Sequence, residues 1–597
     1  MNILGIAHSH EAHACVVSDG KLINCIAEER LSRLKADSSF PKRAVDWVLN
    51  DAKMSAKDID LVCVAGQSGR LFKTVLKQNA CFSVNDFIRQ QHDYWKPKLL
   101  DGQPLSQADE FNMFKHIRGP DLEEDLFYPI IDRQLNSDPA EWSTIGNEMR
   151  KKVIADYIGV CPSKVVFLRH EDCHKAYGIF SSNNMRDNSI VLTLEGGGDD
   201  SAATVSTVQG DKIVEHWSSN DVMVGRLYQQ VTLMLGLKPG QHEYKVMGLA
   251  PYSNEYVGKT SLDLFRSINF VDGIEIKNSH KFRDLYFDVK DALEGERFDG
   301  IAWGLQEYLE EILVKWIKNC ISHFGIKNVI LSGGVAQNIK ACKKILEIPE
   351  LEKFWVGPIS GDGSLAIGAA WLGQKQKFPG VCIHGLSTIY LGSQYNEKEI
   401  DRAIHEFAPK LSGSVIDKPS AELIAQKIFD GAIVARFSGR MEFGQRALGN
   451  RSILANPCDR RTLDFINTKV KFRDFWMPFT PSMTEYQANK MIQNSKKYYS
   501  PFMSMAFDLK PEYQNLMPAA QHPSDRSVRP QMLRREDNTG YYEILREFGK
   551  LSGLEAVLNT SFNLHGEPIV ESPENALESF SKSQIDILLF DHLAISR

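Results

Sequence analysis

A pattern of strand, polar loop and β-hairpin occurs twice in the first 220 residues, and it limits the folds that are open to this chain. The first copy begins with the apolar run NILGIA and continues with ACVVSDGKLINCIAEE, in which Asp19–Gly20 predicts a hairpin turn. The second copy, near residue 190, reads SIVLTLEGGGDDSAATVSTV and has the same order. Two similar units of this kind predict a duplicated α/β domain.

Two consecutive strand–loop–helix units follow. A helix with apolar residues at helical spacing is predicted over 301–324, ending at Gly325. After it, NVILSGGVAQNIKACKKILE and KFWVGPISGDGSLAIGAAWLG each lead from a short strand through a glycine-rich loop into a helix. Because such loops present backbone N–H groups to phosphates, the pair predicts a nucleotide cleft.

Turn residues replace periodicity after Gly373, and we place a domain boundary there. We expect a first domain over 1–380 and a second, mixed α/β domain over 390–597. The segment 84–150 is rich in aromatic and acidic residues. It is interpreted as an insertion over the cleft or, alternatively, as ordinary surface structure.

Charge and cysteine content narrow the function classes. The 597-residue chain has a formal net charge of −6, which gives no general attraction to nucleic acid. Its ten cysteines form no C-x-x-C pair, so we expect a reducing, cytoplasmic setting. We find neither a basic leader nor about 18 uninterrupted apolar residues, and expect no membrane partner.

The stretch RHEDCHKAYGIF contains H-E-x-x-H, formed by His170, Glu171 and His174. In zinc peptidases this motif holds a metal between two imidazoles and uses the glutamate to activate water. Glu195, twenty-one residues after His174, is a candidate third ligand. However, it ends an apolar β-run, whereas the third glutamate of such peptidases projects from a helix. A peptidase is therefore one interpretation of the motif, and not the favoured one.

The metal itself is a separate prediction. His170 and His174 are four residues apart and share one face of a helix. Asp362 in SGDGS, and Glu195 or Asp199 in EGGGDD, are the candidate carboxylate ligands. The alternative is that both histidines only satisfy surface or capping hydrogen bonds.

Basic and amide side chains gather in three stretches of the second domain. The stretches RFSGRMEFGQRALGNRS and NTKVKFRD contribute basic residues among glycines, namely Arg440, Arg446, Arg451, Lys469, Lys471 and Arg473. Guanidinium groups bind phosphate and carboxylate oxygens bidentately, so the pattern favours a nucleotide or a small anion. In LNTSFNLHGEPIV, Asn559, Ser561 and Asn563 are expected after an apolar strand, where they orient a nucleotide or form local turns.

His10 follows the first strand in AHSHEAH, beside His8 and His13. A histidine at a strand end that faces the cleft can take a proton from an attacking hydroxyl. Each of the three histidines can equally be a passive loop residue.

Together these stretches resemble the O-carbamoyltransferases of nodulation-factor and antibiotic-tailoring pathways. The resemblance extends along nearly the whole chain and includes EERLSRLKADSSFP, HEDCHKAYGIF, YKVMGLAPY, LSGGVAQN, SGDGSLAIGAA, GRMEFGQRALGNRSILANP, KVKFRDFWMPFTPS, SVRPQ and LNTSFNLHGEPIV. It implies a duplicated N-terminal domain of the actin/Hsp70 (ASKHA) type, related to the tRNA threonylcarbamoyl-transfer protein Kae1. A YrdC-like α/β domain is implied to follow.

The resemblance also implies a reaction in two steps. The C-terminal domain makes carbamoyladenylate from carbamoyl phosphate and ATP with Mg²⁺, and the N-terminal domain moves the carbamoyl group to a hydroxyl of a small specialised metabolite. Family positions imply His10 as the base, a site for Fe(II) or a similar divalent metal, and two binding regions. The implied metal ligands are His170, His174, Asp362 and Glu195. The residues implied to bind ATP and carbamoyl phosphate are Arg440, Lys471, Arg473, Arg529, Asn559 and Ser561. The residues implied to bind carbamoyladenylate in the N-terminal domain are Lys35, Lys245, Gly333, Gly334 and Asn338.

Four positions depart from the family pattern. Glu195 and Glu11 replace the usual aspartates, Cys342 replaces an asparagine, and Met477 stands where many members have an arginine. Two further alternatives therefore stay open, a tRNA-modifying enzyme of the threonylcarbamoyl pathway and a nucleotide-binding module without catalysis. A homodimer is compatible with the resemblance.

Overall fold

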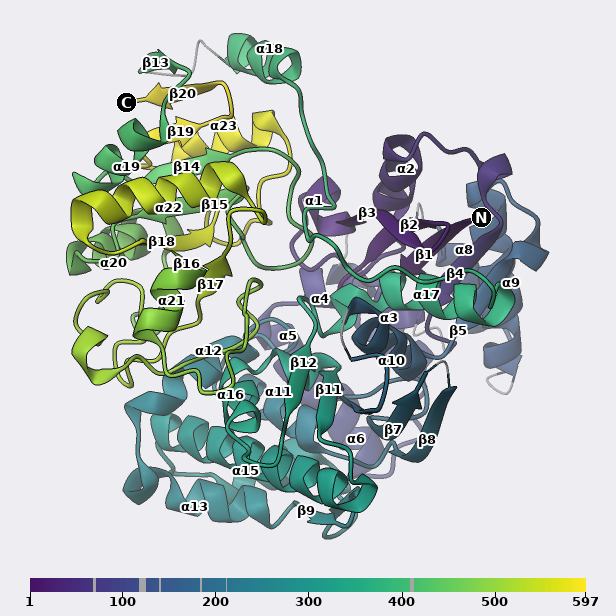
Figure 1. Cartoon of the computed structure of the whole chain (residues 1–597). Helices are drawn as coiled ribbons and strands as arrows, with labels where there is room; N and C mark the ends of the chain where they lie inside the picture. Colours follow the sequence, from purple (N-terminus) through teal and green to yellow (C-terminus); the bar gives the residue numbers. More distant parts are fainter. Residues whose placement is uncertain (68–70, 118–124, 139–140, 183–184, 211, 408–412) are drawn as a thin grey trace. The chain divides into compact units, whose positions relative to one another are not determined.

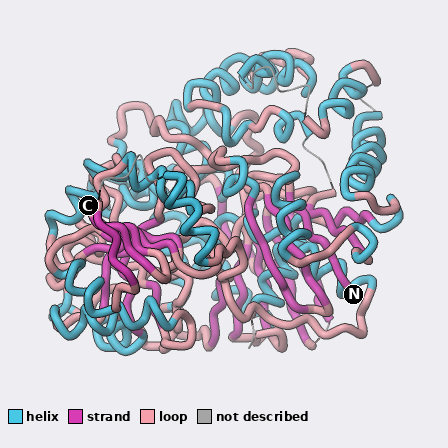
Figure 2. Tube along the Cα trace, turned by 90° about the horizontal axis from the view of Figure 1, so that it is seen from above, coloured by secondary structure: helices cyan, strands magenta, loops and turns pink. Residues whose placement is uncertain are grey.

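The computed structural model describes residues 1–67, 71–117, 125–138, 141–182, 185–210, 212–407 and 413–597 (Figure 1). The chain divides into two compact units, Met1–Ser387 (unit 1) and Thr388–Arg597 (unit 2). In both, helices surround the strands (Figure 2). Within the described ranges, no helix is both long and apolar enough to cross a bilayer.

The first sheet of unit 1 has the strand order β3-β2-β1-β4-β5. Its central strand β1 pairs antiparallel with β2 and parallel with β4. The strands are β1 (Asn2–Ala7), β2 (His13–Ser18), β3 (Lys21–Ala27), β4 (Leu61–Ala65) and β5 (Val165–Leu168). Asp19 and Gly20 have φ of 45° and 79°, which confirms the predicted hairpin turn between β2 and β3.

The second sheet repeats this arrangement with the order β12-β11-β6-β7-β8. Its central strand β6 again pairs antiparallel with the following strand, β7, and parallel with β11. The strands are β6 (Ser189–Leu194), β7 (Ala203–Gln209), β8 (Lys212–Ser219), β11 (Asn328–Ser332) and β12 (Lys353–Val356). The identical pairing confirms the duplicated α/β domain that the sequence predicts.

Helices α10 (His170–Ser181) and α17 (Leu365–Lys377) occupy equivalent places, each after the last strand of its sheet. They approach so closely that a Cβ at Gly368 would lie 2.0 Å from the main-chain oxygen of Cys173. Only glycine fits at this position. The crossing therefore holds the beginnings of the two helices, and the loops before them, at one place.

The two halves differ in their connections. The link from β11 to β12 contains η8 (Gly334–Gln337) and one helix, α16 (Ile339–Leu346), whereas about 100 residues separate β4 from β5. The longer link contains α3 (Leu71–Val75), α4 (Gln78–Cys81), α5 (Val84–Arg89), η2 (Gln90–Trp95), α6 (Lys96–Leu99), α7 (Gln107–Phe114), η3 (Lys115–Ile117), α8 (Tyr128–Leu135) and α9 (Trp142–Ile158). The inserted region thus begins directly after β4, earlier than the predicted 84; residues 68–70, 118–124 and 139–140 within it lie outside the described ranges.

The remaining helices of unit 1 lie in the links from β3 to β4 and from β8 to β11. They are α1 (Glu28–Ser32), α2 (Lys42–Asp51), α11 (Val224–Met234), α12 (Glu243–Leu249), α13 (Glu255–Arg266), α14 (Leu285–Ala292) and α15 (Phe298–Phe324), with the small ribbon β9 (Asn269–Asp272) and β10 (Glu275–Asn278). Gly325 caps α15 with φ 67°, as predicted.

Unit 2 is built on one sheet with the order β13-β20-β19-β14-β15-β18-β16-β17. The strands are β13 (Ser414–Asp417), β14 (Val434–Phe437), β15 (Arg451–Ala455), β16 (Thr480–Thr484), β17 (Gln531–Leu533), β18 (Ala556–Ser561), β19 (Ile587–Leu589) and β20 (Leu593–Ser596). The helices are α18 (Glu397–Phe407), α19 (Ala421–Phe429), α20 (Arg460–Ile466), α21 (Glu485–Met491), α22 (Thr539–Ser552) and α23 (Pro573–Lys582).

Glu28, the first residue of α1, forms hydrogen bonds with the first turn of α2. Its carboxylate accepts the main-chain N–H of Ala44 at 2.8 Å and that of Arg43 at 3.3 Å. Burial raises the pKa of Glu28 to about 7, and the nearby charge of Asp37 adds to the rise against the effect of these hydrogen bonds. The folded state therefore binds a proton that the unfolded chain releases near pH 4.5.

We predict that this group makes unit 1 lose stability as pH rises. Between pH 5 and pH 8, the wild type should lose up to roughly 3 kcal/mol relative to Glu28→Gln, because only the wild type must bury a new charge. Calorimetric unfolding of both chains across this range measures the difference. The exposed control Glu350→Gln should show no such change. A difference that grows in favour of the wild type with rising pH would contradict the prediction.

Candidate metal centre and anion-binding site

Four side chains from three segments of unit 1 meet beside the crossing of α10 and α17. His170 and His174 come from the first turns of α10, Glu195 follows β6, and Asp362 precedes α17. One ligand atom from each lies within 4.8 Å of the others. We call these residues the histidine–carboxylate cluster: His170, His174, Glu195 and Asp362.

The distances within the cluster suit a shared cation. His170 Nε2 lies 2.8 Å from Glu195 Oε2 and 3.7 Å from Asp362 Oδ1. His174 Nε2 lies 3.0 Å from Glu195 Oε1 and 3.6 Å from Asp362 Oδ1. His174 is fully buried, yet neither of its ring nitrogens has a partner of hydrogen-bond geometry among the described residues. A buried imidazole in this situation is costly unless it binds something else, and a metal ion fits.

The charges in the cluster support the same interpretation. Burial alone would lower the pKa of His170, but the charges of Glu195 and Asp362 outweigh it and raise this pKa to about 10. Burial raises the pKa of Glu195, but the charges of both histidines outweigh it and lower the pKa to about 2. Without a metal, protons on the histidines supply the positive charge that two buried carboxylates require. Two imidazoles and two carboxylates are a donor set that suits Fe(II), Mn(II) or Zn(II).

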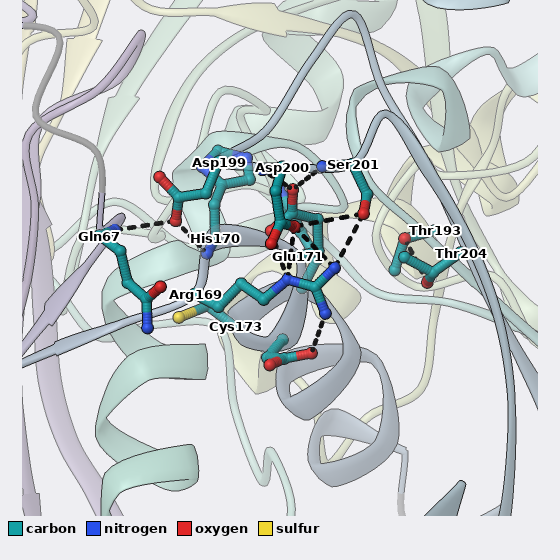
Figure 3. A network of polar contacts seen from close by, with 12 residues as sticks. Gln67, Arg169, His170, Glu171, Cys173, Thr193, Asp199, Asp200, Ser201 and Thr204 are labelled. Atoms are coloured by element: carbon teal, nitrogen blue, oxygen red, sulfur yellow. Dashed lines mark hydrogen bonds and ion pairs between the residues drawn. The ribbon is translucent and has the colours of Figure 1, made fainter. Parts of the chain in front are cut away.

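Glu171, the glutamate of H-E-x-x-H, accepts hydrogen bonds from the main chain. Its carboxylate is buried and accepts the main-chain N–H groups of Ser201 at 2.7 Å and Asp200 at 3.1 Å. Figure 3 shows Arg169 on its other side, with Nε 3.4 Å from Glu171 Oε2 and further contacts to Asp200 and Ser201. A carboxylate held in this way is not placed to activate a water, so the geometry does not support the peptidase interpretation.

Asp199, the alternative carboxylate ligand considered from the sequence, is not part of the histidine–carboxylate cluster. Its Oδ2 accepts the main-chain N–H of His170 and that of Gln67, each at 2.8 Å (Figure 3). It thus caps α10 from a separate loop and connects that loop to the end of β4. The sequence left the choice between Glu195 and Asp199 open, and the structure brings Glu195 to the histidines.

The loop between β1 and β2 lies close to Asp362. Burial raises the pKa of Asp362, but the charge of His170 and the interaction with His174 outweigh it and hold this pKa well below its usual value. The charge of His10 lowers it further. His13 is buried, with Nδ1 2.6 Å from the oxygen of Glu11, and its Nε2 accepts the N–H of Ala366 in α17. Burial lowers the pKa of His13 to about 4, so the ring is neutral. His10 is therefore the exposed histidine of this loop, and it lies near the cluster.

His8 has a structural role. It is buried beneath the ring of Phe127, and its Nε2 lies 2.9 Å from the guanidinium of Arg150. Burial, followed by the charge of Arg150, lowers its pKa well below the usual value. Of the three histidines in AHSHEAH, only His10 is available to a substrate.

The five residues expected to bind carbamoyladenylate in unit 1 are distributed unevenly. Gly333 touches the cluster, since a Cβ there would lie 2.8 Å from Glu195 Cγ, and the space around Gly334 is open. Asn338 instead caps α16, with Oδ1 accepting the N–H of Ala341 at 3.0 Å. Lys35 is exposed, and Lys245 is partly buried on α12.

Three arginines of unit 2 form a second candidate site, the arginine cluster: Arg446, Arg473 and Arg529. Burial lowers the pKa of Arg529 strongly, and the charges of Arg446 and Arg473 lower it further. Arg529 Nε has no hydrogen-bond partner among the described residues. A buried guanidinium beside two like charges, with an N–H group that lacks a hydrogen-bond partner, is unfavourable, so the arrangement suits a bound anion.

Other predicted residues of unit 2 make contacts with the chain itself. Lys471 is buried and donates to Ser561 and Asn563, including Asn563 Oδ1 at 2.7 Å. Arg440 donates to the oxygen of Leu391 at 3.2 Å. Arg451 is fully buried in β15 and donates to main-chain oxygens, among them Ser438 at 2.9 Å. Lys471 and Arg451 thus shape loops through their buried contacts.

The expected position of Asn559 after a strand is wrong. Asn559 and Ser561 both belong to β18, which extends through them because it pairs with β15 and β16. The buried amide of Asn559 donates to Ser482 at 2.8 Å and to the oxygen of Ala447 at 3.0 Å. It therefore ties the arginine-bearing loop 438–450 to the sheet.

Sequence reasoning missed Asn79 of α4, whose side-chain amide contacts His10 Nδ1. The two residues are 69 positions apart, and the surrounding letters LKQNACF carry no motif. Arg446 was noticed only as a basic residue, and its meeting with Arg529 depends on a contact across the sheet.

Comparison with known proteins identifies the family. The carbamoyltransferase N-terminus family model matches residues 2–371, and the carbamoyltransferase C-terminus model matches residues 425–597. The chain therefore belongs to the carbamoyltransferase family and is a transferase enzyme. The resemblance that the sequence motifs indicate is confirmed.

Relatives match along most or part of the chain. Nodulation protein NolNO of Sinorhizobium fredii is 29% identical over 98% of this chain and 79% of its own length. Nodulation protein U of the same species is 30% identical over 45% of this chain and 46% of its own. An uncharacterised protein of Methanocaldococcus jannaschii is 28% identical over the full length of both chains.

Similar solved structures are distant. Component A of the Acidaminococcus fermentans (R)-2-hydroxyglutaryl-CoA dehydratase is 16% identical, with a TM-score of 0.31 over 62% of this chain and 97% of its own. HypF of T. kodakarensis is 13% identical, with a TM-score of 0.32 over 62% of this chain and 47% of its own. Neither is close enough to bear on the site.

We predict that the full chain binds one divalent ion and that the histidine–carboxylate cluster holds it. Anaerobic loading with Fe(II) or Mn(II), desalting and elemental analysis should give one ion per chain for the wild type. His174→Ala and Glu195→Gln should each lower the affinity for the ion at least tenfold. Glu171→Gln should retain the ion but unfold at lower temperature, because two main-chain N–H groups lose a charged acceptor. Full metal content in both His174→Ala and Glu195→Gln would show that the ion binds elsewhere.

Proposed function

We propose that this carbamoyltransferase is ATP-dependent, uses carbamoyl phosphate, and carbamoylates a hydroxyl of a small molecule. The observation that carries the proposal is that each unit has one charged site of the required kind. Unit 2 places two further arginines beside the buried Arg529, which suits phosphates, and unit 1 places an exposed histidine beside a metal-ligand cluster. The net charge of −6 gives no support to a tRNA acceptor.

We assign the first step to the YrdC-like unit 2. In this step ATP, bound together with Mg²⁺, activates carbamate. Water releases inorganic phosphate from carbamoyl phosphate and leaves carbamate. A carbamate oxygen then forms a bond to the α-phosphorus of ATP, and pyrophosphate leaves. The arginine cluster would hold the phosphate groups, while Lys471 and Asn559 keep the surrounding loops in place.

In the second step, which we assign to unit 1, the acceptor oxygen bonds to the carbamoyl carbon and AMP leaves with the oxygen that joined them. His10 receives the hydroxyl proton. Gly333 and the open space at Gly334 let the activated group approach the cluster closely. A divalent ion held by His170, His174, Glu195 and Asp362 would supply Lewis-acid polarisation when bound.

Separation of the two steps is the first test. His10→Asn should remove carbamoylation of a panel of sugars and polyols, detected as a mass increase of one carbamoyl unit. The same variant should retain carbamoyl phosphate-dependent formation of AMP and pyrophosphate, because that chemistry is assigned to unit 2. Loss of both activities in a folded variant would refute the assignment of steps to units.

Removal of one positive charge from the arginine cluster is the second test. Arg529→Met should lower kcat/KM for carbamoyl phosphate-dependent AMP formation by about 10- to 100-fold, since a charge-assisted contact to phosphate is lost. Arg526→Met, three residues earlier and exposed, is the matched control and should behave as the wild type. Equal rates for both variants would remove the arginine cluster from the proposal.

A further inference from the structure

We propose that His13 is a positioning residue of the histidine–carboxylate cluster: its imidazole, with the proton on Nδ1, caps α17, the helix that follows Asp362, and holds the β1–β2 loop against it. The expected effect on carbamoyl transfer rests on the proposed function, whereas the hydrogen bonds do not. His13 begins β2 and pairs with Ala7 at the end of β1. The equivalent pair in the second sheet is Leu194 with Ala203, so the imidazole is particular to the first repeat.

The first observation is that both ring nitrogens of His13 have main-chain partners whose roles are fixed. Nδ1 lies 2.6 Å from the oxygen of Glu11, which can only accept, and Nε2 lies 3.3 Å from the N–H of Ala366, which can only donate. These roles require the proton on Nδ1. The ring is fully buried, and burial lowers its pKa to about 4, so the neutral form is the one present at pH 7.

The second observation is that α17 lacks a cap of its own. The first N–H groups of a helix have no acceptor within the helix, and the N-cap side chain usually accepts one of them. At α17 the N-cap residue is Ser364, but its hydroxyl donates to the main-chain oxygen of Gly361 at 2.8 Å. His13 supplies an acceptor from the other sheet. Gly5 permits this approach, because a Cβ there would lie 2.2 Å from the main-chain oxygen of Ala366.

The third observation is that the other half of unit 1 has the reciprocal cap. Helix α10 also has no side-chain bond from its own N-cap residue, and Asp199, between β6 and β7, accepts the N–H of His170 (Figure 3). Each helix thus follows the last strand of one sheet and is capped from the first hairpin of the other. The two caps lie beside His170 and Asp362, so together they fix the two halves of the cluster relative to each other.

The bond from His13 to Glu11 extends this constraint to the β1–β2 loop. The carboxylate of Glu11 lies against the segment that carries Asp362, since a Cβ at Gly363 would lie 2.5 Å from Glu11 Oε2. The same loop carries His10, whose charge acts on Asp362. Without the His13 bonds, this loop and the first turn of α17 could move independently, and Asp362 would be held less firmly at the cluster.

The first experiment determines the tautomer in the full chain labelled with 15N-histidine. Imidazole nitrogen shifts report the protonation of each ring nitrogen, and the signals of His13 are those that disappear in His13→Gln. We expect a protonated Nδ1 and an unprotonated Nε2 at pH 7. A proton on Nε2, or on both nitrogens, would overturn the inference.

The second experiment measures the affinity for Mn(II). His13→Leu removes both hydrogen bonds and should weaken binding at least tenfold, whereas His13→Gln, whose side-chain oxygen can accept the N–H of Ala366, should restore most of the affinity. Tyr308→Phe is the matched control, because it removes a buried hydrogen bond to Asn269 elsewhere in unit 1, and it should bind as the wild type does.

Three results of the Mn(II) measurement would overturn the inference. They are wild-type affinity in folded His13→Leu, equal losses in His13→Gln and His13→Leu, and no binding by the wild type, which would leave no metal centre to position.

The proposed function fails by a different observation, the absence of carbamoyl phosphate-dependent AMP formation in the wild type, on which neither measurement depends. With that activity present, His13→Leu should lower carbamoyl transfer to glycerol, used as the probe acceptor, about tenfold more than AMP formation, which is assigned to unit 2. Equal reductions of the two activities in the folded variant would contradict a role at the cluster.

Discussion

The close crossing of α10 and α17 is the constraint on which the candidate metal centre depends. Gly368 lets α17 approach the main-chain oxygen of Cys173, and a larger residue would push the helices apart. The two helices follow the last strands of the two repeats, so their first residues come from equivalent places in the duplicated fold. Duplication therefore explains why histidines from one repeat meet an aspartate from the other.

The same symmetry accounts for the loops around the centre. The loops after β1 and β6 are equivalent, and they supply His10 and Glu195 near Asp362. What breaks the symmetry is the insertion after β4, which brings α4 and Asn79 to His10. The first half thus supplies the two histidines of the cluster and the histidine proposed to act on the acceptor, and the second half supplies the two carboxylates.

Local patterns predicted much of the fold, because each depends on neighbours in the chain. The turn at Asp19–Gly20, the end of α15 at Gly325 and the repeated strand–loop–hairpin units are examples. Contacts between distant segments could not be predicted in this way. Glu171 looks like a catalytic residue by its spacing in the motif. However, the main-chain N–H groups that donate to its carboxylate lie on a loop about 30 residues later. Asn559 was expected after a strand, although pairing with two strands keeps it in β18.

The metal centre is the central claim of this account, and anomalous diffraction tests it most directly. Crystals of the full chain loaded with Mn(II) or Fe(II) should give an anomalous peak among His170, His174, Glu195 and Asp362, with distances of about 2.0–2.3 Å to their nitrogen and oxygen atoms. Well-ordered side chains at the present positions with no peak between them, in a crystal shown to contain the metal, would contradict it.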